Sequence, residues 1–140
     1  MKYIGLVGYS DKKFNTTIAK ALIQIAFQII ENTNEYKNET LCLVSGLTNL
    51  GIPKLGYEIA TQKGWQTMGI ACEKAKDYEL FKVNETIIKG ENWGDESETF
   101  LNKIDALIRV GGGQQSIKET QLAKNKGLTV LEYDLPLSKN

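Results

Sequence analysis

Hydrophobic residues along the chain fall into short solid runs separated by longer periodic stretches. A short apolar run without polar alternation predicts a strand that is buried on both faces of a sheet. Such runs are Tyr3–Val7, Leu41–Val44, Thr67–Ala71, Thr86–Ile88, Ala106–Val110 and Leu128–Leu131. Strands of this kind are typical of parallel sheets that are covered by helices.

The periodic stretches between these runs predict helices. In Ile18–Ile30 the apolar residues recur every three or four positions and form a broad apolar face, which predicts a long helix. Shorter helices are expected from Pro53 to Lys63, within Glu73–Leu80, after Asp95, and over Ser116–Lys126. Strands and helices therefore alternate along the chain.

Several residues mark where these helices begin or end. Pro53 suits the first turn of a helix, and Gly64 and Gly127 suit the position just after a helix ends. Asp95 and Glu98 have the D-x-x-E spacing of a capping box, in which each side chain bonds a free backbone N–H group. We expect that box to open the helix that precedes Ala106.

The alternation predicts one α/β domain over residues 1–140, Rossmann-like, with a mostly parallel sheet and helices on both faces. At 140 residues the chain is long enough to bury an ordinary core without disulfide staples. No internal repeat or low-complexity linker divides it.

Composition excludes several classes of function. The chain is 41% hydrophobic and 24% charged, with a formal net charge of zero, which is typical of a globular protein. A neutral chain with scattered lysines gains little from counterion release, so we expect no nucleic-acid partner. The longest apolar stretch contains Lys20, Gln24 and Gln28, so we expect no membrane insertion and a cytoplasmic location.

The chain has no histidine, which excludes Ser-His-Asp and Cys-His relays and histidine metal sites. Acid–base chemistry would fall to Asp, Glu, Lys, Tyr or water. Cys42 and Cys72 have no close Cys or His neighbours and are expected to be reduced structural thiols. We expect no resident metal ion or cofactor.

The strand Ala106–Val110 runs directly into three glycines, Gly111, Gly112 and Gly113, and a helical pattern follows. Glycines let the backbone turn sharply and bring N–H groups close to a ligand, and the first amides of a helix carry partial positive charge. This combination predicts an anion-binding corner, most often for phosphate. Ser116 is expected to cap the helix there and to lie beside the anion.

Small residues also follow two other strands. Gly8 and Ser10 come after the first, and Ser45 and Gly46 end the second. The carboxyl ends of parallel strands meet at one edge of the sheet, so we expect these residues to lie near the three glycines and to line a pocket. Each pair could also form an ordinary turn.

Two further side chains are candidates for the same site. Glu119 could close a capping box with Ser116, accept hydrogen bonds from ribose hydroxyls, or act on water at a glycosidic carbon. Trp93 could stack on a purine, although tryptophan in a loop is as often part of an interface or core.

These motifs resemble those of the Lonely-Guy-like, or SLOG, superfamily of Rossmann-like nucleotide-binding proteins, which includes phosphoribohydrolases and molybdenum-cofactor carrier proteins. The residues that carry the resemblance are Gly8, Ser10, Ser45-Gly46 with Gly51 and Gly56, and Gly111–Glu119 in place of GGGxGTxxE. Gln115 stands where that motif has glycine, and Ser116 replaces threonine. The hydrolases use an arginine from a helix beside the ligand, whereas Arg109, the single arginine here, lies in a strand.

The resemblance implies a phosphate-binding loop and a pocket for a nucleotide or a nucleotide-derived small molecule. The first hypothesis is binding without turnover. The alternative is an N-glycosidic hydrolase or transferase acting on a nucleoside monophosphate, with Glu119 as the key carboxylate. A nucleoside deoxyribosyltransferase and a structural subunit whose glycine loop is filled by a partner also remain open. Proteins of this kind usually form homo-oligomers through a long apolar helix.

Overall fold

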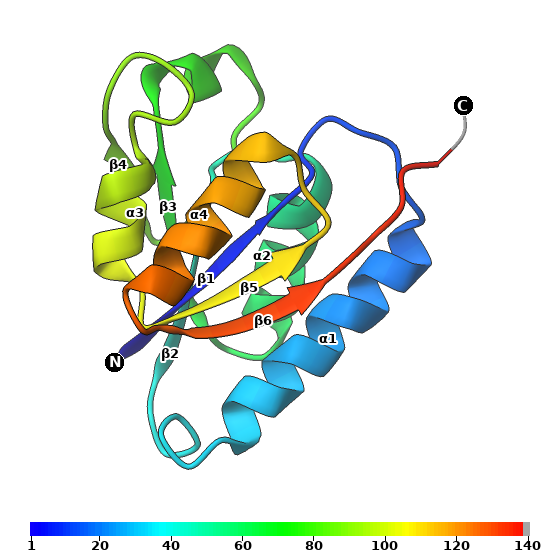
Figure 1. The fold of residues 1–140 in the computed structure, drawn as a ribbon, viewed down its shortest axis with the longest axis vertical. Coiled ribbons are helices and arrows are strands. Elements are labelled where there is room, and N and C mark those ends of the chain that lie inside the picture. The colour runs from blue at the N-terminus through cyan, green and yellow to red at the C-terminus, as the bar shows by residue number, and fades with distance from the viewer. Residues whose placement is uncertain (139–140) are drawn as a thin grey trace.

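The computed structural model describes residues 1–138 and shows one α/β domain built on a single sheet of six strands (Figure 1). All neighbouring strands run parallel. The strands are β1 (Lys2–Gly8), β2 (Leu41–Ser45), β3 (Gln66–Ala71), β4 (Glu85–Ile88), β5 (Ala106–Val110) and β6 (Thr129–Tyr133). The predicted Rossmann-like class and all six predicted strands are confirmed.

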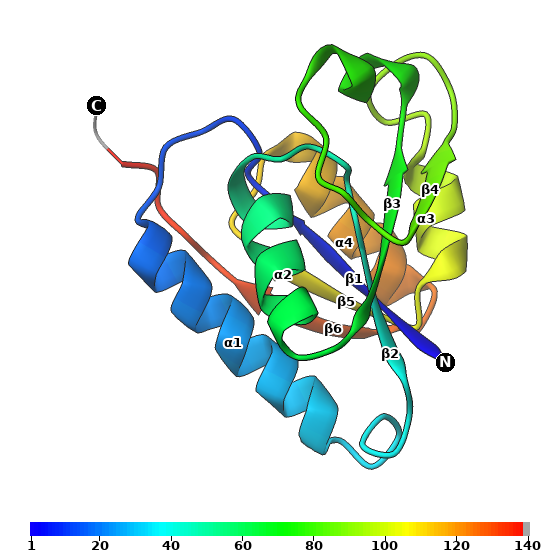
Figure 2. The ribbon, with the colours of Figure 1, turned by 180° about the vertical axis from the view of Figure 1, so that it is seen from behind.

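Helices connect the strands and cover the sheet (Figure 2). They are α1 (Thr16–Asn32), α2 (Gly51–Gln62), the short 3₁₀ helix η1 (Glu73–Asp77), α3 (Ser97–Lys103) and α4 (Gln114–Asn125). Within residues 1–138, none of them has both the length and the apolar character needed to cross a membrane.

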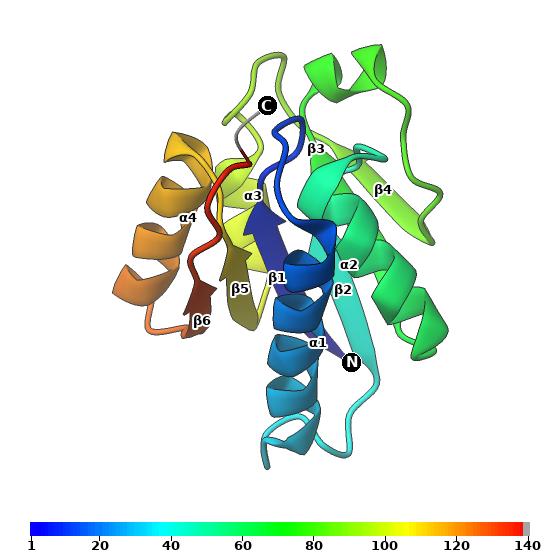
Figure 3. The same ribbon diagram turned by 90° about the vertical axis from the view of Figure 1, so that its right-hand side faces the viewer.

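The strand order β4-β3-β2-β1-β5-β6 places the first strand in the interior of the sheet. The chain winds outward from β1 to β4 and then returns to the other side of β1, where it continues with β5 and β6. Helices α1 and α2 consequently cover one face, and α3 and α4 cover the other (Figure 3). The winding reverses between β1 and β5, and ligands of open α/β sheets bind at the carboxyl ends of the strands on either side of such a point.

Each face of the sheet has its own apolar core. On the first face, Phe27 of α1 stacks on Trp65 with ring centroids 4.5 Å apart. Gly56 of α2 lies so close to β1 that a Cβ atom there would be 2.1 Å from the Leu6 side chain. The absence of that side chain lets the helix pack directly against the central strand, so Gly56 serves the fold rather than a loop.

The predicted capping box at the start of α3 is wrong. The Asp95 carboxylate instead accepts hydrogen bonds from the N–H groups of Glu91 and Asn92, at 3.0 and 2.9 Å, and so closes the preceding loop. Glu96 occupies the capping position and makes no capping hydrogen bond. Loop closure and helix capping compete for the same carboxylate acceptor, and here the Asp95 carboxylate bonds the loop.

Candidate functional site

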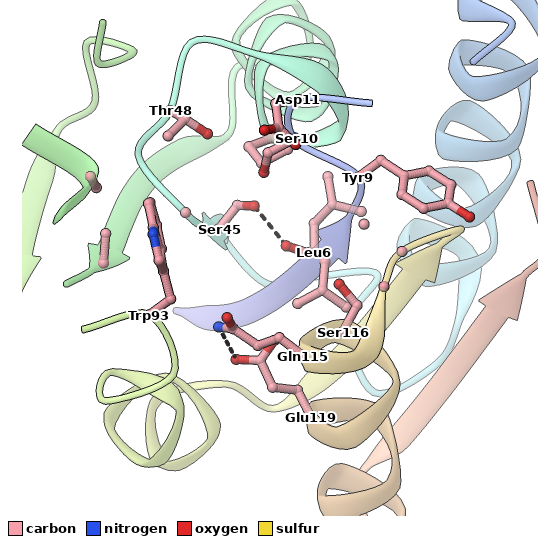
Figure 4. A pocket seen from close by; sticks show the side chains of 18 of the residues that line it. Leu6, Tyr9, Ser10, Asp11, Ser45, Thr48, Trp93, Gln115, Ser116 and Glu119 are labelled. Carbon is pink, nitrogen blue, oxygen red and sulfur yellow. Dashed lines mark hydrogen bonds between the residues drawn. The ribbon is translucent and has the colours of Figure 1, made fainter. Parts of the chain in front are cut away.

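A cavity of about 560 Å³ lies at the carboxyl ends of β1, β2 and β5, beside the point where the winding reverses. The structure places along its wall every site residue predicted from the sequence except Gly111. These residues are Gly8, Ser10, Ser45, Gly46, Gly112, Gly113, Ser116, Trp93 and Glu119 (Figure 4). Segments far apart in the sequence thus meet at one edge of the sheet.

The glycine turn after β5 depends on two left-handed residues. Gly111 has φ of 62° and Gly112 has φ of 108°, in a region that side-chain-bearing residues rarely adopt. A Cβ atom on Gly111 would lie 2.5 Å from the Tyr9 ring, and one on Gly112 would lie 2.5 Å from Cβ of Ser116. These two glycines are therefore required by the path of the backbone, and Gly111 supports the turn from behind the cavity.

Helix α4 begins at Gln114, two residues earlier than predicted, with Gly113 at the capping position. The first α-helical hydrogen bond runs from Ile117 N–H to the Gly113 carbonyl, at 3.1 Å. The N–H groups of Gln114, Gln115 and Ser116 consequently have no partner inside the helix. Ser116 is not the cap; it lies buried in the first turn, so the free amides at this end are not satisfied by a capping hydroxyl.

Gly46 and Gly113 differ from every other glycine of the chain. The chain has thirteen glycines. In eleven of them either a positive φ or a neighbour within van der Waals distance accounts for the missing side chain. At Gly46 and Gly113 the backbone is ordinary, and a Cβ atom would meet nothing within 4 Å. Both residues line the cavity, so packing against the protein explains neither one.

Gly8 and Ser45 have structural roles in addition to forming the wall. A Cβ atom on Gly8 would lie 2.3 Å from the Val110 carbonyl oxygen, so glycine permits close approach of β1 and β5. The Ser45 hydroxyl donates a hydrogen bond of 2.6 Å to the Leu6 carbonyl. Neither residue therefore serves only to form a turn. The Ser45 hydroxyl can only accept a further hydrogen bond from a ligand, because its proton is already used.

Glu119 lies on the second turn of α4 and is 6% exposed. Its Oε2 atom accepts a hydrogen bond of 2.7 Å from Ser97 of α3 and a longer one of 3.5 Å from Gln115. Burial raises the pKa of Glu119, and the nearby charge of Glu96 raises it further, while the two hydrogen bonds oppose the shift. The predicted capping box with Ser116 is not formed, so Glu119 faces α3 and the cavity.

Glu96 is a second carboxylate in the cavity wall, and it is absent from the predicted site. It is 6% exposed, and its Oε1 atom accepts a hydrogen bond of 2.7 Å from Gly94 N–H. In the sequence it belongs to the acidic run Asp95–Glu98, in which Asp95 and Glu98 are the predicted capping box. Only the position of α3 turns one carboxylate of that run inward.

Trp93 projects into the cavity from the loop before α3 (Figure 4). It is 47% exposed, and its ring meets that of Tyr78 edge-on with centroids 6.0 Å apart. A tryptophan ring that is about half exposed in a cavity wall can accept a flat ring by stacking.

Arg109 lies outside the cavity. Its guanidinium reaches toward β6 and contacts Glu132 at 3.3 Å and Asp134 at 2.9 Å. Lys12 is therefore the only cationic side chain that lines the cavity within residues 1–138. Glu96, the residue just before α3, adds a carboxylate to the wall.

Comparison with solved structures identifies the same architecture elsewhere. The chain superimposes on the molybdenum cofactor carrier protein MCP from Chlamydomonas reinhardtii with a TM-score of 0.72 and 19% identity, covering 94% of this chain and 75% of that one. The chain has the fold of this carrier protein. A second structure of the Chlamydomonas carrier gives a TM-score of 0.64 and 18% identity, over 94% of this chain and 75% of the carrier.

A third solved structure with a similar fold is that of the structural genomics target TM1055, with a TM-score of 0.67, 18% identity, and coverage of 93% of this chain and 72% of that one. At the level of the fold, these likenesses confirm the resemblance that the glycine motifs predicted. No protein-family model and no curated protein sequence matches the chain.

Proposed function

We propose that the protein binds a phosphorylated nucleotide or a nucleotide-derived small molecule in the cavity at the carboxyl ends of β1, β2 and β5. The observation that carries this proposal is the pair Gly46 and Gly113, two ordinary backbone positions in the cavity wall where a Cβ atom would meet nothing within 4 Å. Beside Gly113, the unpaired N–H groups at the start of α4 suit an anion.

The rest of the wall fits the remainder of such a ligand. Trp93 offers an aromatic face, and Ser10, Thr48 and Gln115 offer polar groups around the space between it and the glycine turn (Figure 4). The carrier protein with the same fold is named for a small molecule that it carries, which supports binding rather than turnover.

A thermal-shift assay with matched ligands tests the proposal. A nucleoside monophosphate at about 100 times its dissociation constant adds roughly 2.7 kcal/mol to the free energy of unfolding, and the nucleoside without phosphate adds far less. Gly113→Ala abolishes the shift because its methyl group enters the anion site. An equal shift from nucleoside and nucleotide, or no shift across mono-, di- and cyclic nucleotides, would contradict the proposal.

The alternative function is cleavage or transfer of an N-glycosidic bond in a nucleoside monophosphate. The raised pKa of buried Glu119, caused first by desolvation, favours this candidate because general acids are tuned in the same direction. Binding is the preferred function because the only arginine points away from the cavity, toward Glu132 and Asp134. The cavity therefore has no arginine, within residues 1–138, to steady a departing group.

Chromatography of nucleotide incubated with the protein separates the two functions. Binding without turnover returns the nucleotide unchanged from wild type. Release of free base by wild type, lost in Glu119→Gln while the nucleotide still binds, would establish the alternative.

A further inference from the structure

We propose that a second site, the groove between the N-terminal parts of α1 and α2, binds a small molecule that carries two or more linked phosphate groups. The groove has a volume of about 740 Å³ and lies beside the cavity, with which it shares Ser10, Asp11 and Lys12. The inference concerns this groove alone and does not rest on the proposed function.

Four lysines from three separate segments line the groove. Lys12 and Lys13 belong to the loop after β1, Lys20 belongs to α1, and Lys54 belongs to α2. Two carboxylates line the same groove, so the lysines outnumber them. The chain as a whole has equal numbers of basic and acidic residues, so this excess of positive charge is a local feature.

The four lysines are not neutralised by the protein. Within residues 1–138, no carboxylate oxygen lies within 4.0 Å of any of their ammonium groups, although Asp11 and Glu58 line the same groove. Elsewhere in the chain, Lys63 pairs with Glu31 at 2.6 Å. The lysines of the groove therefore leave their charge available to an anion.

Both helices begin at this groove, beside the loop after β1, with side chains that oppose their dipoles (Figure 3). The start of a helix favours acidic residues, yet neither α1 nor α2 has one in its first turn. Lys54 is instead the fourth residue of α2, and Lys12 and Lys13 precede α1. Like charges gathered at two positive helix ends destabilise the fold, and such conflicts are expected mainly at functional sites. A bound anion would relieve the repulsion.

The size of the groove and the type of cation indicate the class of ligand. Small-molecule sites have volumes of roughly 300–1,000 Å³, and the groove falls within this range at about 740 Å³. A single phosphate ion would occupy only a small part of it, whereas linked phosphates spread several negative charges over lysines from three segments. Lysine binds phosphate as a point charge and needs no fixed orientation.

Titration calorimetry with orthophosphate, pyrophosphate and tripolyphosphate in metal-free buffer tests the inference. We expect tripolyphosphate to bind at least about tenfold more tightly than orthophosphate, because it engages more of the lysines. The double variant Lys20→Gln/Lys54→Gln changes the groove but not the cavity and should weaken tripolyphosphate binding by about tenfold. The matched control, Lys37→Gln/Lys82→Gln, removes two exposed charges outside the groove and should leave the affinity within about twofold.

Thermal unfolding in anion-free buffer gives a second readout. Lys20→Gln/Lys54→Gln should raise the melting temperature by about 1–4 °C, because it removes repulsion at the helix starts. Lysine and glutamine have similar helix propensities, so the shift reports the charge. A variant that is more stable and yet binds tripolyphosphate less tightly cannot have lost binding by unfolding. A lower melting temperature would overturn the inferred conflict at the groove.

Gly113→Ala separates this inference from the proposed function, because Gly113 lines the cavity and not the groove. Tripolyphosphate binding that survives in Gly113→Ala supports the groove, and binding lost there would place the anion in the cavity and overturn the inference. Equal losses in the two lysine pairs would also overturn it, since general surface charge would be the cause. Equal affinity for orthophosphate and tripolyphosphate, or no binding of either, would do the same. None of these results bears on the nucleotide thermal shift.

Discussion

The Nη1 group of Arg109 donates a hydrogen bond of 2.8 Å to the carbonyl oxygen of Gly111. The same guanidinium contacts Glu132 and Asp134, so it fastens the first residue of the glycine turn to β6 and the segment after it. Burial alone would lower the pKa of Arg109, but its carboxylate partners raise it overall, so the group stays charged. The arginine supports the cavity from behind without lining it.

Arg109→Gln should destabilise the fold by roughly 1–3 kcal/mol, because the Gly111 carbonyl loses a charged donor. Urea unfolding measures the change. Arg109→Lys should recover only part of it, since a single ammonium cannot reach all three partners as the planar guanidinium does. The control is Lys124→Gln, which removes an exposed ion pair to Glu132 and should cost less than about 1 kcal/mol. Equal losses for Arg109→Gln and Lys124→Gln would show that the bond to Gly111 contributes nothing.

Neighbouring glycines of the turn should respond in opposite ways. Gly112→Ala forces a positive φ on alanine and a clash with Ser116, so it should destabilise the fold by about 1–3 kcal/mol. Gly113→Ala and Gly46→Ala meet no neighbour and should change stability by less than about 1 kcal/mol. Thermal unfolding without ligand measures this contrast. If Gly113→Ala unfolds as readily as Gly112→Ala, the open space at Gly113 is filled by the protein itself.

Glu119→Gln should stabilise the protein at neutral pH. Burial raises the folded-state pKa of Glu119 above its unfolded value, so the folded state binds the proton more tightly. Stability from this group is therefore fully present at low pH and is lost as the pH rises through the folded pKa. The melting temperature of Glu119→Gln should exceed that of wild type at pH 7, and the gap should close near pH 4. Glu98→Gln, with an exposed side chain, should show no such dependence. A difference in melting temperature that widens on acidification would show that folding lowers the pKa of Glu119 instead of raising it.

The long helix α1 should join two copies of the chain. Ile18, Ile25 and Ile29 are 48%, 48% and 43% exposed, and with the partly buried Leu22 they form one stripe along the outer side of α1. Light scattering at micromolar concentration should show a homo-oligomer, and Ile25→Glu should convert it to a monomer. Gln24→Glu adds the same charge on the same helix about 100° away and should leave the assembly intact. A monomeric wild type would refute this prediction.

The sequence predicts the sheet well because buried parallel strands are solid apolar runs. β2 and β5 are examples: each is a run of 5 residues, which is too short for a typical helix, and burial on both faces makes the run apolar. The ends of helices are harder to predict. Asp95 and Ser116 have the right residue type and spacing for caps, but one closes a loop and the other lies inside the first turn. Local chemistry permits either use, and tertiary structure decides between them.

The candidate site was predictable in its location but not in its charge. Parallel topology alone brings Gly8, Gly46 and Gly113 to one edge of the sheet. No feature of the sequence distinguishes Glu96 from Glu98, because the inward direction of one depends on how α3 packs. The sequence also cannot distinguish a glycine that relieves strain, such as Gly112, from one that leaves open space, such as Gly113. That distinction depends on which atoms lie near each glycine in the folded protein.

The last described residues return to the cavity. Phe14 and Leu137 form an antiparallel bridge, Ser138 N–H donates to the Lys13 carbonyl at 2.8 Å, and Leu137 lines the cavity wall. The N-terminus lies at the opposite end of β1 (Figure 1). An affinity tag or fluorophore appended after residue 138 would therefore crowd the cavity mouth and distort titrations, whereas the same label before Met1 would stay clear of it.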